Sequence, residues 1–117
     1  MSALKLPYPP SANRLWRAVN GRQIKSQHYR AWLALAEVEI RLHRPHRISG
    51  AYHLSIVAHR PDRRRRDIDN LIKPISDAIT AAGMVDDVAD AQSVKAEWSD
   101  YRPSFPGSVV VMVEAAE

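Results

Sequence analysis

The stretch Arg63-Arg64-Arg65-Arg66-Asp67-Ile68-Asp69-Asn70-Leu71-Ile72-Lys73 places four consecutive cations directly before two carboxylates, with an amide and an amine within the next helical turn. Arginines can hold a polyanion, and closely spaced carboxylates can hold a divalent metal ion against it. Few binding tasks need both kinds of group at adjacent positions. The stretch therefore indicates a metal-dependent enzyme that acts on nucleic acid.

The charge along the chain changes sign inside this stretch. Residues 1–66 carry 14 Lys/Arg against 3 Asp/Glu, whereas residues 67–117 carry 3 against 10, within a net charge of +4. A basic half favours a phosphate-bearing partner. The acidic half would repel that partner unless some of its carboxylates bind metal or pair with arginines.

The overall composition, 45% hydrophobic and 26% charged, is that of an ordinary globular protein, and 117 residues suit a single domain spanning 1–117. The sequence contains no cysteine, which excludes thiolate zinc sites and a cysteine nucleophile and suits a reducing compartment. It shows no signal pattern, and no apolar run approaches the roughly 18–20 residues of a membrane span. We therefore expect a soluble, intracellular protein.

The N-terminal part predicts one strand followed by a loop. Met1 to Leu6 is apolar and favours a strand, which Pro7-Tyr8-Pro9-Pro10 ends because proline lacks an amide donor. Ser11 to Gln27 is expected to be a loop, since its serine, asparagine and glycine supply turns. Its cations surround Trp16, so this loop either grips a sugar-phosphate backbone or is simply solvated.

Two helices and three more strands are expected after that loop. Ser26 is the expected N-cap of a helix from His28 to about His43, whose apolar stripe has helical spacing: Tyr29, Leu33, Ala36 and Ile40, broadened by Trp32, Leu35 and Leu42. A second helix is expected from Asp67 to Ala82, capped by Asp69 or Asn70. Strands are expected over 51–59, 91–98 and 108–114. The order β-α-β-α-β-β predicts an α+β fold, a small mixed sheet with both helices on one face.

Asp67 and Asp69 lie at the expected junction between a strand, a loop and a helix, where both carboxylates can converge. Mg²⁺ commonly takes one or two carboxylates together with a substrate phosphate. A third acid between Asp86 and Asp90 returns to this pair only if its strand lies alongside the strand that ends near His59. Lys73, one turn after Asp69, can stabilise a developing charge or orient water.

Each of these features also has a simpler interpretation. Asp69 or Asn70 can serve only as a helix cap, the arginines can form only a solvated loop, and Asp86-Asp87 can be only a turn. Their occurrence together favours a nucleic-acid-binding domain with a metal site. Composition and spacing leave open whether that site is catalytic.

The motif Pro61-Asp62-Arg63-Arg64-Arg65-Arg66-Asp67-Ile68-Asp69-Asn70-Leu71, followed by Lys73, Ala82-Gly83 and an Asp-Asp pair, resembles the RusA family of Holliday junction resolvases. Pro9-Pro10-Ser11-Ala12-Asn13-Arg14 resembles the opening of that family. Chain length and element order agree as well, so the resemblance covers essentially all 117 residues.

This resemblance implies a RusA-like fold and a crossover junction endodeoxyribonuclease: a homodimer, dependent on Mg²⁺ or Mn²⁺, that resolves four-way DNA junctions by paired symmetric nicks in recombination and repair. It implies a cytoplasmic protein of bacterial or phage origin, without membrane partner or organic cofactor. Position by position, it assigns the metal-binding and catalytic acids to Asp67, Asp69 and Asp87, and the catalytic lysine to Lys73. We expect DNA contacts from Arg63, Arg64, Arg65, Arg66, Asn70, Arg14 and Arg17.

The sequence departs from the family pattern at two places. The segment from Asp86 to Gln92 is one or two residues longer than usual, so Asp90 is the alternative to Asp87 as third acid. Pro74 is also unusual beside Lys73. Two other functions stay open at this point, a DNA-binding module without catalysis and a related nuclease that acts on forks or flaps.

Overall fold

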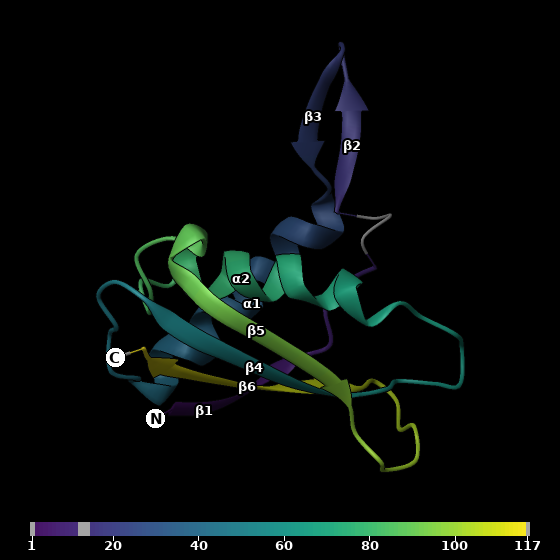
Figure 1. Ribbon diagram of the computed structural model, residues 1–117. Helices are drawn as coiled ribbons and strands as arrows, with labels where there is room; N and C mark the ends of the chain where they lie inside the picture. The colour runs from purple at the N-terminus through teal and green to yellow at the C-terminus, as the bar shows by residue number, and fades with distance from the viewer. Residues whose placement is uncertain (1, 12–14, 117) are drawn as a thin grey trace.

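The computed structural model describes residues 2–11 and 15–116 (Figure 1). Six strands are present in this part of the chain: β1 (Ser2–Pro7), β2 (Trp16–Val19), β3 (Arg22–Lys25), β4 (Tyr52–His59), β5 (Ala91–Trp98) and β6 (Ser108–Ala115). Two α-helices, α1 (Gln27–His43) and α2 (Ile72–Ala81), are accompanied by the short 3₁₀ helices η2 (Ile68–Leu71) and η3 (Val88–Asp90).

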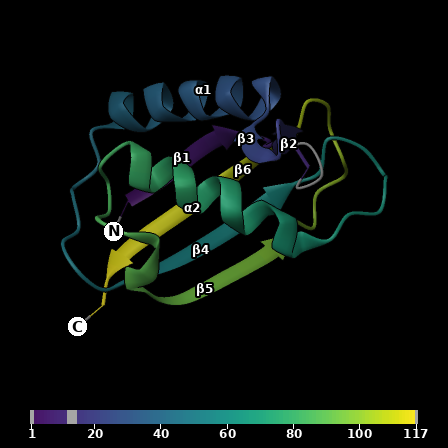
Figure 2. The same ribbon diagram turned by 90° about the horizontal axis from the view of Figure 1, so that it is seen from above.

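Four of the strands form the central sheet in the order β1-β6-β4-β5. Strand β6 pairs antiparallel with both β1 and β4, whereas β4 and β5 run parallel, as the connection through α2 requires. Both α-helices lie over one face of this sheet (Figure 2). The predicted α+β class, with a mixed sheet and helices on one face, is confirmed.

The core lies between the helices and the covered face of the sheet. Along β4 the burial alternates with period two, as the sequence pattern predicted. Helix α1 contributes four buried residues to this core: Tyr29, Trp32, Ala36 and Ile40. Leu35 and Leu42, expected to broaden this stripe, are instead 60% and 71% exposed, because the α1 face that reaches the sheet is narrower than predicted.

The two helices begin differently from one another. Ser26 caps α1 as predicted, with its Oγ accepting a hydrogen bond from the Tyr29 amide at 3.1 Å. The expected cap of the second helix is wrong, since neither Asp69 nor Asn70 caps it and no side chain makes a cap hydrogen bond at η2 or α2. The chain instead enters through one 3₁₀ turn, which places Pro74 in the first turn of α2, where its missing amide costs little.

The expectation of a loop from Ser11 to Gln27 is wrong for residues 16–25. These residues form an antiparallel hairpin, β2–β3, that projects away from the sheet and helices (Figure 1). Its turn is Asn20-Gly21, with φ of 50° and 76°, the backbone that a tight hairpin requires at both central positions. The dipeptide Asn-Gly was the available sequence signal, and the polar character of the flanking residues concealed it.

The helices that the structure describes are all too short or too polar to cross a lipid bilayer.

Candidate active site

A cavity of about 470 Å³ brings together the two motifs that resemble the family. One wall comes from the segment after β1, and the other from the arginine run and η2: Tyr8, Pro9, Pro10, Ser11, Arg65, Arg66, Asp67, Asn70 and Leu71. The Tyr8 hydroxyl is buried and has no hydrogen-bond partner among the described residues. Burial raises the pKa of Tyr8, although Arg66 and Arg60 nearby oppose that shift. The cavity therefore has arginines in one wall and, in the other, a tyrosine whose hydroxyl is buried.

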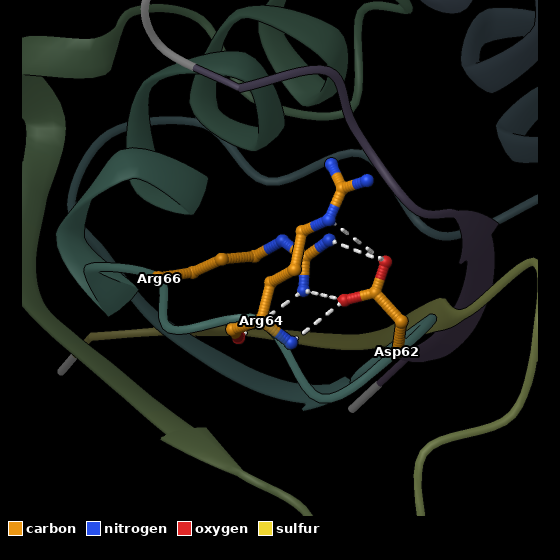
Figure 3. A network of polar contacts seen from close by, with 3 residues as sticks. All are labelled: Asp62, Arg64 and Arg66. Carbon is orange, nitrogen blue, oxygen red and sulfur yellow. Dashed lines mark hydrogen bonds and ion pairs between the residues drawn. The ribbon is translucent and has the colours of Figure 1, made fainter.

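Asp62 organises the arginine run (Figure 3). Its two carboxylate oxygens accept hydrogen bonds from the Arg66 guanidinium at 2.7 and 3.0 Å, and one also accepts from the Arg64 amide at 2.9 Å. The bonds from Arg66, followed by that from the Arg64 backbone, lower the pKa of Asp62 to about 2. Arg63 and Arg65 are exposed and form no ion pair within the described part of the chain, so they are available for phosphate.

Asp67 directly precedes the short turn η2 that follows the arginines, Asp69 lies within that turn, and both are exposed. Within residues 2–11 and 15–116 neither carboxylate forms a hydrogen bond or an ion pair. Neither side chain therefore makes a capping hydrogen bond or pairs with an arginine of the described residues. The interpretation without catalysis required these contacts. Two unpaired carboxylates beside a cationic cavity fit the donor set of a hard divalent cation, which takes oxygen ligands and completes its shell with phosphate and water.

The third acid lies elsewhere in the chain. Asp87 is the N-cap of η3, where its Oδ1 accepts a hydrogen bond from the Ala89 amide at 2.8 Å. Asp90 and Asp87 act on the Tyr52 hydroxyl, whose pKa is raised by burial and then by these two charges. Tyr52 is the first residue of β4, so both acids lie at the start of that strand.

The parallel register explains this separation. Ala91 pairs with Tyr52 and Trp98 with Ala58, so the acids that precede β5 lie at the opposite end of the sheet from the loop that follows β4. Figures 1 and 2 show η2 and η3 at opposite ends of α2. No three His, Asp or Glu side chains of the described residues are grouped closely enough to hold a metal ion. Within one chain, therefore, Asp67 and Asp69 lie near each other, whereas Asp87 and Asp90 lie at the other end of the sheet.

Lys73 is held by a network in which the sequence predicted that Asp77 shares its helix face but did not indicate the contact with Tyr29. Its Nζ lies 3.2 Å from both carboxylate oxygens of Asp77, one of which also accepts a hydrogen bond from the buried Tyr29 hydroxyl. Burial and this bond to Asp77 raise the pKa of Tyr29. The Lys73 ammonium also lies 5.8 Å from the centre of the Trp16 ring. The spacing of four residues between Lys73 and Asp77 was the only sequence signal for this contact.

Two further residues were expected to contact DNA. Arg14 lies outside the described residues, together with Ala12 and Asn13. Arg17 lies on β2, in the projecting hairpin, rather than at the cavity.

A mixed sheet that carries an arginine-lined cavity and unpaired carboxylates defines a protein suited to chemistry on a phosphate backbone. Comparison with known proteins makes this specific: the family described as "Endodeoxyribonuclease RusA" matches residues 7–114. The crossover junction endodeoxyribonuclease RusA of Escherichia coli (strain K12) is 42% identical over 107 residues, covering 86% of this chain and 78% of the relative. The protein of the same name from Enterobacteria phage 82 is 42% identical over 106 residues, covering 85% and 78%.

The chain therefore belongs to the RusA family of endodeoxyribonucleases. The predicted resemblance and the predicted enzyme class are confirmed at the level of the family.

Proposed function

We propose that this chain is a divalent-metal-dependent endonuclease that resolves four-way DNA junctions by paired symmetric nicks, in recombination and repair. One observation carries the proposal: the carboxylates of Asp67 and Asp69 stay unpaired although four arginines directly precede them. The names of the relatives, crossover junction endodeoxyribonucleases from bacteria and a phage, support the substrate and a cytoplasmic site of action.

The roles of the residues follow from where they lie. Arg63 and Arg65 hold phosphates of the junction, while Arg66, fixed by Asp62, shapes the cavity wall. Asn70, which also lines the cavity, contacts the DNA backbone. Asp67 and Asp69 would hold the metal ion, Mg²⁺ or Mn²⁺, which supplies Lewis-acid activation of water and of the phosphate. Lys73 stabilises the charge that develops on the phosphodiester oxygens.

The proposal includes a homodimer, for two reasons. A junction has two equivalent strands to cut, and a two-fold assembly presents two sites to them. In addition, only the family resemblance assigns Asp87 to the metal site. Within one chain Asp87 lies at the other end of α2 from Asp69. In a homodimer each site can receive this third acid from the second copy.

The Asp69→Asn variant tests the assignment. It removes one metal ligand and one negative charge, so we expect nicking of a labelled four-way junction in Mg²⁺ to fall by about a hundredfold or more, with binding unchanged or tighter. Asp100→Asn removes the same charge from the loop after β5 and serves as the matched control.

Nicking by Asp69→Asn at the wild-type rate would contradict the site. Parallel assays with a fork, a flap and a linear duplex distinguish a junction resolvase from a related nuclease with another branched substrate. A wild-type protein that binds the junction but yields no product in Mg²⁺ or Mn²⁺ would contradict catalysis.

A further inference from the structure

We propose that the β2–β3 hairpin, residues 16–25, is a DNA-binding arm that lies against a duplex beyond the cleavage site. This inference rests on the proposed function only in taking DNA as the ligand. Its first support is charge, because the hairpin carries Arg17, Arg22 and Lys25 and contains no acidic residue. An exposed ribbon of one charge sign suits a phosphate backbone and opposes association with a basic surface.

The second support is how little of the hairpin packs on the body. Every side chain of β2 is exposed, and in β3 only Ile24 is partly buried. Two-stranded hairpins are marginally stable by themselves, so an unpacked one gains by binding something. The Asn20-Gly21 turn keeps the two strands paired at the tip.

The base of the arm, by contrast, is firmly anchored. Leu15 is 2% exposed and belongs to the core, and its carbonyl accepts a hydrogen bond from the Ser26 amide at 2.8 Å. The Trp16 ring meets the edge of the buried Tyr29 ring, with centroids 6.2 Å apart. The arm therefore has a fixed origin and a free outer part.

The register gives the arm a face that suits a groove. Arg17 pairs with Ile24 and Val19 with Arg22, so the two arginines lie on the same face but on opposite strands. A two-stranded ribbon fits the major groove of B-DNA, where cations on its two edges can reach both flanking phosphate backbones. Four residues per strand extend about 13 Å, at about 3.3 Å per residue, or roughly four base pairs.

The position of the arm connects it with the candidate active site. Trp16, at its base, contacts Lys73 on α2. DNA bound at the carboxylates therefore has the arm on the Lys73 side of the cleavage point. The arm adds duplex contacts there and leaves the chemistry to η2 and α2.

The test measures how binding depends on salt. Arg22→Ala and the double variant R17A/R22A, which removes both arginines of that face, are titrated with a labelled four-way junction and with a linear duplex, without divalent metal, between 50 and 200 mM salt. Because each phosphate contact contributes about 0.9 to the slope of log K against log salt, we expect the slope to fall by about 0.9 per cation removed per bound arm. At 0.1 M salt this corresponds to about an eightfold loss of affinity per cation.

Arg41→Ala is the matched control, because it removes the same charge from the far end of α1, where Glu37 is its one ion-pair partner among the described residues. Its slope is expected to equal that of the wild type. The hairpin is exposed, so thermal unfolding of the arm variants should match the wild type, and nicking at saturating protein should be retained.

Two outcomes would overturn the arm. One is a set of slopes for R22A and R17A/R22A equal to that of R41A, and the other is a changed oligomeric state of the double variant, which would assign the hairpin to subunit association. The result is separable from the proposed function. If the wild type nicks the junction but the arm variants keep the wild-type slope, only the DNA-binding role of the hairpin is contradicted. If the arm variants have reduced slopes but the wild type shows no nicking, the nuclease function is contradicted and the DNA-binding role of the hairpin is supported.

Discussion

At the scale of single residues, Asp62 decides what the arginine run can do. By taking the guanidinium of Arg66 and the amide of Arg64, it fixes the loop and leaves Asp67 and Asp69 without a cationic partner. By pairing with Arg66, Asp62 thus leaves two other acids unpaired among the described residues. The cavity keeps a positive side because Arg65, which lines it, takes no part in this contact.

The depressed pKa of Asp62, about 2, gives a prediction for acid stability. Because the folded-state pKa lies below the unfolded value of 3.8, the charged carboxylate stabilises the fold above about pH 4, and this contribution disappears as pH falls toward 2. Asp62→Asn lacks it at every pH. Thermal unfolding of both proteins should show a lower Tm for the variant at pH 6 and a shrinking difference between pH 4 and 2. An equal difference at pH 2 and pH 6 would contradict this.

In the proposed mechanism Asp77 is a positioning residue, because it holds Lys73. Asp77→Ala leaves the fully buried Tyr29 hydroxyl without an acceptor and should cost about 1–3 kcal/mol in urea unfolding, whereas Asp77→Asn keeps an oxygen there and should cost less. Both variants free Lys73, so single-turnover nicking should fall about tenfold or more in each. Glu37→Gln, which breaks the exposed pair with Arg41, should change neither quantity appreciably. Normal nicking by Asp77→Asn would show that Lys73 needs no such support.

At the scale of elements, the loop after β4 depends on its contact with the start of β6. A Cβ on Gly107 would lie 2.9 Å from the His59 carbonyl oxygen and 2.9 Å from the Pro61 nitrogen, and Gly107 has a φ of +77°. Both neighbours are backbone atoms, which cannot move aside as a flexible side chain can. The arginine run begins two residues after Pro61, so its position is set by this contact.

Gly107→Ala should therefore lower stability by about 2–4 kcal/mol, combining left-handed strain with the steric clash. Gly83→Ala is the control, since Gly83 has a φ of +78° but no atom within 4 Å of the added Cβ, and it should cost about 1–2 kcal/mol. Urea unfolding measures both. Equal losses of stability in the two variants would mean that β6 and the loop move apart to accommodate the added Cβ without an energetic penalty.

At the scale of the whole molecule, the proposed homodimer can be given a specific arrangement. Strand β5 is an edge of the sheet, with η3 before its first residue and η2 beside its last (Figure 2). Antiparallel pairing of β5 with its counterpart would place η3 of one copy beside η2 of the other. Asp87 of each chain would then complete the carboxylate pair of its partner, as the proposed homodimer requires.

Mixing two inactive variants tests this arrangement. If each site draws Asp69 from one copy and Asp87 from the other, Asp69→Asn and Asp87→Asn homodimers are both inactive, but a mixed dimer retains one intact site. Mixing under subunit exchange should restore nicking of one strand per junction, up to about a quarter of wild-type product formation, because half the dimers carry one of two sites. Asp90→Asn in place of Asp87→Asn decides between the two acids. No recovery, with exchange verified, would contradict a shared site.

Much of the fold followed from the sequence because its signals are local. The alternation along β4, the Ser26 cap and the spacing of Tyr29, Ala36 and Ile40 each depend on residues within a few positions of one another. The hairpin also had a local signal, its Asn20-Gly21 turn. It was missed because its strands have no buried face and so show no alternation of apolar and polar residues. The family motif, likewise, is contiguous and was recognisable as it stands.

The tertiary structure alone decided how the site is assembled. It placed Tyr8 and Pro9 in the wall of the same cavity as the arginine run and paired Arg66 with Asp62. It set the Tyr29 hydroxyl against Asp77, which pairs with Lys73. It also placed Asp87 at the opposite end of β5 from Asp69, through the parallel register with β4. Residue types and local spacing determine which groups can bind a phosphate or a metal ion, but the partner of each charge depends on how segments some fifty residues apart pack together.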